Sequence, residues 1–282
     1  MSERLFTESD FADFRDLILE RTGISIRETR IDYLEFRVLE RVRSVNAGTV
    51  RDYYYRLKYG PHDDPEFQAL VNAITVQETY FYRNPRQLET LKNNLLPEVL
   101  ERKKQEADQS LSLWSAACAT GEEPYTLGMI SREASHLVGN RRVDIYATDI
   151  STRALELAAK ASYAENKLRE MSAAARVRFF DQSGDQWIVK DDIRNLVRFR
   201  RINLVDDRQT LGLPQMDIIL CRNVFIYFSP KAKIQVARLL YAKLKPGGYL
   251  LLGNAETIDV VQVPFRMKFM EGGMVYWKPA GA

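Results

Sequence analysis

The chain has 282 residues, room for two domains or one large one, and its 45% hydrophobic and 28% charged content is ordinary for a soluble globular protein. Its formal net charge of +3 is too small to indicate nucleic-acid binding by itself. The two cysteines, Cys118 and Cys221, lie far apart and belong to no CxxC or Cys/His cluster, so we expect no metal site. We expect a cytoplasmic protein without membrane insertion, because the sequence contains neither a signal-peptide core nor an apolar run of ~20 residues.

Residues 1–82 carry the apolar periodicity of α-helices and are predicted to form an all-helical domain. The helices are expected over residues 11–23, 31–44, 50–58 and 65–74. In the second of them Arg37 and Arg41 lie one turn apart on the same face.

Residues 83–282 alternate between strand and helix patterns. The strands are expected at residues 111–117, 142–148, 196–203, 216–222 and 248–253. The main helices are expected at residues 126–137, 151–163 and 231–244, and a closing hairpin at 266–278, turning at Gly272 and Gly273. Parallel strands with helical crossovers and a terminal hairpin predict an α/β fold with a Rossmann-like, seven-stranded sheet of the methyltransferase type.

One segment, residues 176–195, breaks this rhythm because it alternates apolar and polar residues around a Ser183-Gly184 turn. We predict a short antiparallel β insertion at the edge of the sheet. An exposed edge could pair with a strand of a partner, although a simple edge hairpin with no partner fits equally well.

The most informative motif is the turn within residues 115–125, where a strand-like run ends at Thr120-Gly121 and a helix opens at Glu122. Strand, tight turn and helix begin a nucleotide-binding βαβ unit. Here, however, Glu122 and Glu123 stand where a phosphate would bind, and their charges would repel it. The predicted ligand therefore has a nucleoside end and a cationic end, and S-adenosylmethionine fits this description.

Asp149 closes the next predicted strand, residues 142–148. In Rossmann-type sheets the acid at this place accepts hydrogen bonds from ribose hydroxyls. The alternative is that Asp149 only caps the helix that begins at Ser151 or Thr152.

Further polar residues follow the strand 216–222, namely Arg222, Asn223 and Tyr227, where ligands bind in open α/β sheets. Upstream, three aromatic residues and Arg83 crowd the junction 80–83 between the two domains. This junction could form a lid over the ligand or simply an inter-domain core, and the same ring faces can serve both purposes.

Together these motifs resemble one family, the bacterial chemotaxis receptor glutamate methyltransferases (CheR). The resemblance covers nearly the whole chain and rests on several motifs in the right order. They are ETYFYR (78–83), TGEEPY (120–125), ATDIS (147–151), INL (202–204), CRNVFIYF (221–228) and LKPGGYLLLGNAET (244–257).

The resemblance implies S-adenosylmethionine as methyl donor, S-adenosylhomocysteine as product, and glutamates on the cytoplasmic methylation helices of a chemoreceptor as acceptors. Carried over by motif, the cofactor-binding residues are Gln77, Thr79, Arg83, Glu123, Asp149, Asn203, Leu204, Arg222 and Asn223. Among them Glu123 takes the methionine ammonium, Asp149 the ribose, and Asn203 and Leu204 border the adenine. Arg83 and Tyr227 are the implied catalytic residues, beside the transferring methyl. A carboxylate acceptor is already ionised at neutral pH, so no general base is required.

The chain departs from the family pattern at three places. Gln77 stands where the family usually has Asn, and Asn254 stands where the family has His in a GHSE motif. The β insertion also looks shorter than in members that dock a receptor's C-terminal pentapeptide, so we expect no dependence on such a tether.

Receptor recognition is assigned to the helical domain, with Arg37 and Arg41 steering the acidic methylation helices by charge. Solvated arginines with no partner are the plain alternative. Two other functions stay open: a methyltransferase of another acceptor on the same fold, and a catalytically silent cofactor-binding scaffold.

Overall fold

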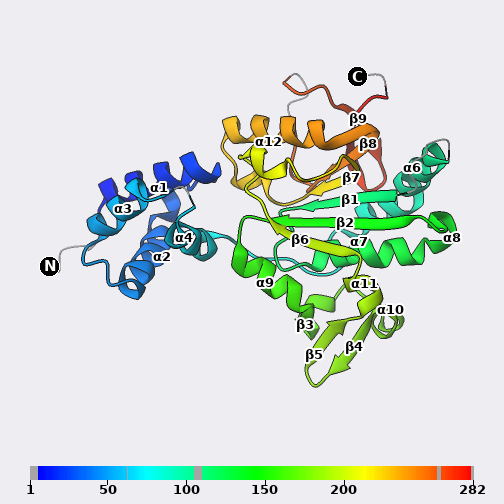
Figure 1. Cartoon of the computed structure of the whole chain (residues 1–282), viewed down its shortest axis with the longest axis horizontal. Helices are drawn as coiled ribbons and strands as arrows, with labels where there is room; N and C mark the ends of the chain where they lie inside the picture. Colours follow the sequence, from blue (N-terminus) through cyan, green and yellow to red (C-terminus); the bar gives the residue numbers. More distant parts are fainter. Residues whose placement is uncertain (1–5, 62, 105–109, 259–261, 281–282) are drawn as a thin grey trace.

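The computed structural model describes residues 6–61, 63–104, 110–258 and 262–280. Figure 1 shows a helical domain at the N-terminal side, joined by an extended linker to a larger α/β domain. The helical domain contains α1 (Glu8–Thr22), the short η1 (Glu28–Arg30), α2 (Ile31–Ser44), α3 (Val50–Tyr59) and α4 (Pro65–Ile74). The predicted helices of this domain are therefore confirmed.

Local sequence explains where these helices begin and end. Thr7 caps α1 and Thr49 caps α3, each in a capping box with an aspartate three residues later. Gly23 ends α1 in the left-handed region, with φ of 72°, which glycine adopts without a Cβ penalty. The apolar faces then meet in one core that includes the fully buried rings of Phe14 and Tyr53.

The α/β domain is built on a seven-stranded sheet of order β6-β2-β1-β7-β8-β10-β9. Its strands are β1 (Ser110–Ala116), β2 (Arg142–Asp149), β6 (Val197–Arg201), β7 (Met216–Cys221), β8 (Leu244–Leu252), β9 (Arg266–Met270) and β10 (Gly273–Trp277). In this spatial order, the neighbouring strands β6, β2, β1, β7 and β8 all pair in parallel, and β10 runs antiparallel to both β8 and β9. This confirms the predicted seven-stranded sheet and its terminal hairpin.

Helices cover both faces of this sheet (Figure 1). They are α5 (Pro85–Thr90), the π-helical turn η2 (Leu91–Leu95), α6 (Leu96–Lys103), α7 (Glu122–Glu133), α8 (Ser135–Val138), α9 (Thr152–Lys160) and α12 (Pro230–Lys243). Alternate residues of a strand point to opposite faces. In β1, accordingly, Leu113 packs into the core that contains α6 and α7, whereas Trp114 packs into the core that contains α12. None of the helices in the described part of the chain is long and apolar enough to cross a membrane.

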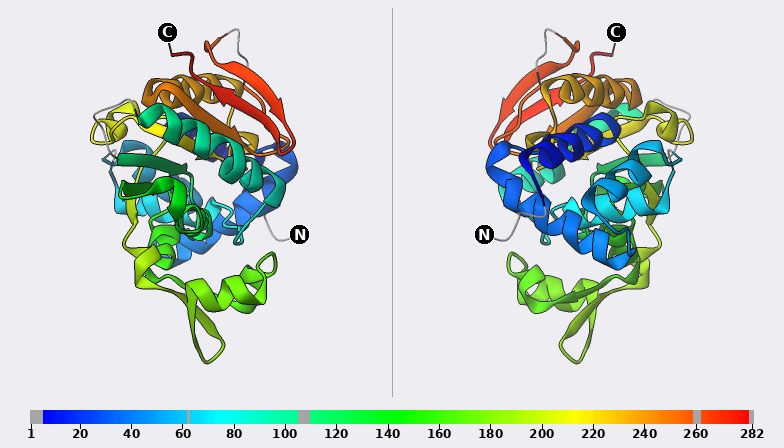
Figure 2. Two further views of the ribbon diagram at one scale, coloured as in Figure 1. Left: turned by 90° about the vertical axis from the view of Figure 1, so that its right-hand side faces the viewer. Right: turned by 90° about the vertical axis from the view of Figure 1, so that its left-hand side faces the viewer.

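The predicted antiparallel β insertion is present, but it does not extend the edge of the main sheet, so its expected place is wrong. It forms a separate antiparallel sheet of order β3-β5-β4, which projects below the main sheet in Figure 2. Its strands are β3 (Ser162–Ala164), β4 (Phe180–Ser183) and β5 (Gln186–Val189), packed with η3 (Glu165–Leu168), α10 (Ala173–Phe179) and α11 (Asp191–Arg194). The end of the predicted helix 151–163 is therefore β3, because Ala161 leaves the helical region with φ of 54° and the chain turns.

Candidate functional site

A single pocket lies where the carboxyl ends of β1, β2, β6 and β7 face the helical domain. Nine of the residues predicted for the site line it: Thr79, Arg83, Glu123, Asp149, Asn203, Leu204, Arg222, Asn223 and Tyr227. Gln77 does not line it, although its neighbours do. Its Nε2 instead donates a hydrogen bond to Ser151 Oγ at 3.1 Å, which helps to join the linker to the start of α9.

Asp149 lies at the bottom of this pocket, only 9% exposed. Its Oδ2 accepts the Ala119 N–H and its Oδ1 accepts the Ser151 N–H, both at 2.8 Å. Burial raises the pKa of Asp149, and these backbone bonds oppose the rise. The helix cap of α9 is Ser151 itself, through its hydroxyl. Each carboxylate oxygen of Asp149 has further acceptor capacity, so a hydroxyl donor can still bind.

The two glutamates of the turn have different roles, so the expectation that both would face the ligand is wrong. Glu122 is fully buried, paired with Lys167 at 3.1 Å and hydrogen-bonded by Thr120 Oγ1 at 2.7 Å. Glu123 alone faces the pocket. Adjacent helical residues point about 100° apart, so a single helix start can direct one acid to the core and the next to the ligand.

Glu123 is held between a hydroxyl and a buried cation. Ser115 Oγ donates to its Oε1 at 2.7 Å, and Arg222 Nε lies 3.4 Å from its Oε2. Burial raises the pKa of Glu123, and the charge of Arg222 counteracts this. Arg222 Nε has no hydrogen-bond partner among the described residues, while its Nη2 donates to the Arg83 carbonyl. A partly neutralised carboxylate beside free space is suited to receive an ammonium group.

Arg83 and Tyr227 reach the same pocket from the linker and from η5 (Phe225–Tyr227). Arg83 Nη1 donates to the Glu78 carbonyl at 2.8 Å, and its guanidinium carbon lies 5.8 Å from the Tyr80 ring centroid. Among the described residues, no carboxylate pairs with Arg83 and no group hydrogen-bonds the Tyr227 hydroxyl. Both side chains therefore keep donor capacity for a ligand.

The helical domain forms one wall of the pocket, which the sequence motifs did not predict. Thr22, Ile24, Ser25, Ile26, Arg30 and Tyr33 all line it. The Ser25 N–H donates to the Tyr227 carbonyl at 2.7 Å, and the Ser229 N–H donates to the Gly23 carbonyl at 3.1 Å. No local sequence pattern predicts these contacts between the domains, because the paired residues are about two hundred positions apart in the sequence.

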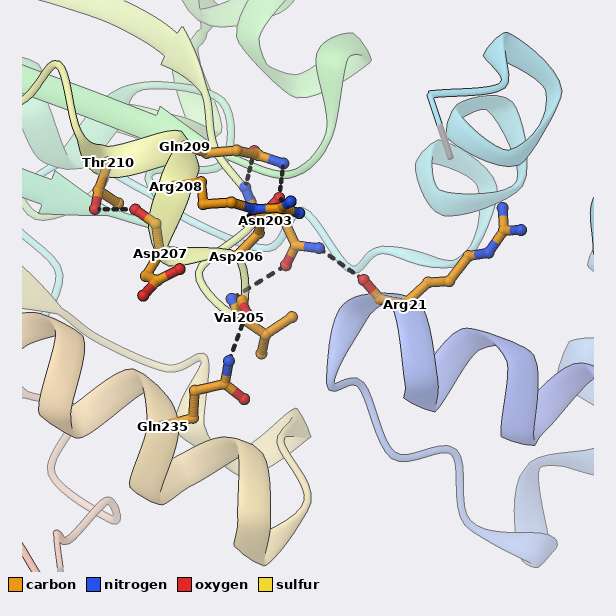
Figure 3. Close-up of polar contacts among 9 residues, drawn as sticks. All are labelled: Arg21, Asn203, Val205, Asp206, Asp207, Arg208, Gln209, Thr210 and Gln235. Atoms are coloured by element: carbon orange, nitrogen blue, oxygen red, sulfur yellow. Dashed lines mark hydrogen bonds and ion pairs between the residues drawn. The ribbon is translucent and has the colours of Figure 1, made fainter. Parts of the chain in front are cut away.

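Asn203 also joins the two domains. Figure 3 shows its Nδ2 donating to the Arg21 carbonyl of α1 at 2.7 Å, while its Oδ1 accepts the Val205 N–H at 3.3 Å. The side-chain amide is thus engaged within the protein. Asn203 and Leu204, each 6% exposed, still border the pocket between these anchors.

Glu256 stabilises the loop that follows β7, and the sequence analysis did not predict this role either. This buried carboxylate accepts backbone N–H groups of Asn223 at 2.6 Å, Gly253 at 2.7 Å and Ile226 at 3.2 Å. Asn223 adopts a left-handed φ of 59°, so the loop after β7 needs such support. An acid four residues after the end of β8, within the motif at 244–257, was the available signal.

Arg37 and Arg41 lie on α2 as predicted, but their surroundings differ. Arg41 forms a bidentate pair with the buried Glu66, at 2.9 and 2.7 Å. Arg37 lies 3.4 Å from Glu40 and stacks on the rings of Tyr33 and Phe36. Arg41 therefore stabilises the helical domain, and Arg37 is the more available of the two for a partner.

The described residues contain no group of three or more His, Cys, Asp or Glu side chains that could hold a metal ion. Cys118 and Cys221 are both buried and free, and burial raises the pKa of each thiol.

Comparisons with known proteins find family models and relatives that match both domains. A family model described as "CheR methyltransferase, SAM binding domain" matches residues 77–274, and "CheR methyltransferase, all-alpha domain" matches residues 9–75. The chain is 31% identical to "Chemotaxis protein methyltransferase 2" of Vibrio cholerae, over 99% of this chain and 96% of that protein. It is 37% identical to "Chemotaxis protein methyltransferase 1" of Pseudomonas aeruginosa, over 74% of this chain and 76% of that protein. The matches span both domains in the order observed.

Proposed function

Since the chain belongs to the CheR methyltransferase family and is an S-adenosylmethionine-dependent methyltransferase, we propose that it methylates glutamate side chains of a chemoreceptor. The products are glutamyl methyl esters and S-adenosylhomocysteine. The observation that carries this proposal is the pocket itself, which combines two inward acids with Arg83 and Tyr227. The acids suit the cofactor, and the two free donors suit an anionic acceptor.

The described residues fit S-adenosylmethionine. Glu123 would hold the amino-acid ammonium and Asp149 the ribose hydroxyls, while Leu204 and Ile202 offer apolar surface for the base. Arg222, whose Nε has no hydrogen-bond partner among the described residues, lies where the methionine carboxylate would follow the ammonium. Burial of these charged groups makes their pairing with a zwitterionic ligand favourable.

The chemistry requires alignment more than acid–base catalysis. S-adenosylmethionine, when held by these residues, would supply an electrophilic methyl on its sulfonium for transfer to the acceptor carboxylate, with S-adenosylhomocysteine as the leaving group. Arg83 presents a planar donor fork that orients this carboxylate, and the Tyr227 hydroxyl donates to one of its oxygens. The ester product has lost the negative charge, so its contacts with Arg83 weaken. Proximity and orientation therefore supply most of the acceleration.

For the acceptor, we propose the acidic helices of the receptor's cytoplasmic methylation region, recognised in part by the helical domain (residues 1–82). Arg37, a cation of α2 whose side chain is 35% exposed and lies 3.4 Å from Glu40, supports this. The small separate sheet has short strands of three or four residues, so we propose that turnover does not depend on a C-terminal receptor tether.

The test is incubation with methyl-labelled S-adenosylmethionine and purified receptor cytoplasmic domains, followed by mild base. Glutamyl methyl esters release labelled methanol, whereas N-methyl products keep the label on the protein. Base-stable label would favour another acceptor chemistry. Cofactor binding without label transfer to any receptor domain would favour a silent scaffold and contradict the proposal.

A further inference from the structure

The ring of Tyr80 contacts the guanidinium groups of two arginines that come from different segments of the chain. Its half-buried ring lines the pocket. The guanidinium carbon of Arg169 lies 3.5 Å from the ring centroid, and that of Arg83 lies 5.8 Å from it. A cation within about 6 Å of an aromatic centroid is attracted by the ring. Tyr80 therefore holds a second cation beside the proposed catalytic arginine.

The small sheet fixes Arg169 at this place. Lys167, two residues earlier, donates its Nζ to the Thr79 carbonyl at 2.8 Å, and its own carbonyl accepts the Phe81 N–H at 3.0 Å. Tyr80 thus lies between two residues, Thr79 and Phe81, whose backbones are hydrogen-bonded to Lys167. Phe81 is fully buried and packs its ring against Tyr163 and Phe180, at 4.8 and 5.0 Å between centroids. The segment that carries Tyr80 and the segment that carries Arg169 are consequently joined side by side.

The charge of Arg169 is not neutralised by the protein around it. Its side chain is exposed, and its one hydrogen bond runs from Nη1 to the Asn166 carbonyl at 3.3 Å. Over the described ranges no carboxylate pairs with Arg169 or with Arg83. The ring of Tyr80, which lines the pocket, thus lies beside two guanidinium groups that form no ion pair with a carboxylate among the described residues.

We propose that Arg169 is an acceptor-binding residue, which holds a second carboxylate one helical turn away from the glutamate that is methylated. This inference rests on the proposed function and names the local sequence that the site selects. The two guanidinium carbons can be no farther apart than the sum of their distances to the Tyr80 centroid. Side chains one turn apart on a helix have Cβ atoms ~5–6 Å from each other, so two long acidic side chains can reach both arginines.

The experiment compares Arg169→Ala with Arg178→Ala, using the receptor cytoplasmic domain that the wild-type enzyme methylates. Arg178 belongs to the same small sheet unit and is exposed, and its guanidinium carbon lies 5.0 Å from the ring centroid of Phe179, which, unlike Tyr80, does not line the pocket. Both variants therefore lose the same charge and the same kind of ring contact. Arg169→Ala should raise the KM for the receptor domain about two- to tenfold at low salt, an effect that shrinks at high salt. Its kcat and its affinity for S-adenosylmethionine should match those of the wild type.

A charge exchange makes the test specific. Arg169→Glu should raise the KM further, and a receptor domain with lysine in place of the acid one turn from the acceptor should restore part of the loss. Equal KM values for Arg169→Ala and Arg178→Ala, or no rescue by the exchanged receptor, would overturn this inference while leaving receptor methylation intact. If the wild-type enzyme forms no base-labile ester on the receptor, the proposed function itself fails.

Discussion

Replacing Tyr227 by Phe tests the chemical step separately from binding and folding. The Tyr227 hydroxyl lines the pocket and has no hydrogen-bond partner among the described residues, so its removal should change the free energy of unfolding by less than about 0.5 kcal/mol. If the hydroxyl donates to the acceptor carboxylate in the transition state, the lost bond to a charged group is worth about 1.5–3 kcal/mol. That corresponds to a decrease in kcat of about ten- to 150-fold.

The assay is methyl transfer to the receptor domain at saturating S-adenosylmethionine, together with calorimetric measurement of cofactor affinity. A decrease in kcat with unchanged cofactor affinity indicates an interaction made chiefly in the transition state. Tyr249→Phe provides the control, because Tyr249 donates to Glu98 at 2.5 Å and lies outside the pocket. It should lose about 1.5–3 kcal/mol of stability, since this hydrogen bond is also made to a charged group, and keep its turnover.

Wild-type turnover by Tyr227→Phe would refute the catalytic assignment and leave the ring as a wall of the pocket. A large loss of stability in the same variant would show that the hydroxyl has a structural partner, which also contradicts the argument.

Two further predictions concern the cofactor. Asp149→Ala should weaken S-adenosylmethionine binding at least about tenfold in calorimetry, since each charge-assisted bond to ribose is worth about 1.5–3 kcal/mol, whereas Asp144→Ala on the same strand should not. Because burial raises the pKa of Glu123 and an ammonium ligand favours the ionised form, wild-type affinity should fall as pH drops through that raised pKa. Glu123→Gln should bind more weakly and should lose the part of the pH slope that Glu123 contributes. Asp149, whose pKa burial also raises, contributes the remaining slope, so an unchanged slope in this variant would assign the titration to Asp149.

Much of the fold follows from short-range patterns. The helices of the N-terminal domain and the strands of the sheet lie close to where apolar periodicity put them, because caps, turns and side-chain periods act within a few residues. The main errors in the predicted secondary structure occurred where the local sequence pattern fitted both helix and strand. Residues 162–164 continue a helical pattern but pair with β5, and residues 176–179 alternate but form the end of α10. Tertiary contacts decided both.

By itself the sequence determined the family, the sheet, and nine of the residues that line the pocket, since these depend on contiguous motifs at strand ends. Only the tertiary structure decided which member of an adjacent pair is available to a ligand. Lys167 pairs with Glu122 and leaves Glu123 to face the pocket, whereas the buried Glu66 pairs with Arg41 and Arg37 lies beside the exposed Glu40. It also placed Arg169 on Tyr80, which lies far earlier in the chain. The physical reason is the same each time: a charge is free or paired according to what packs against it, and those partners come from distant parts of the chain.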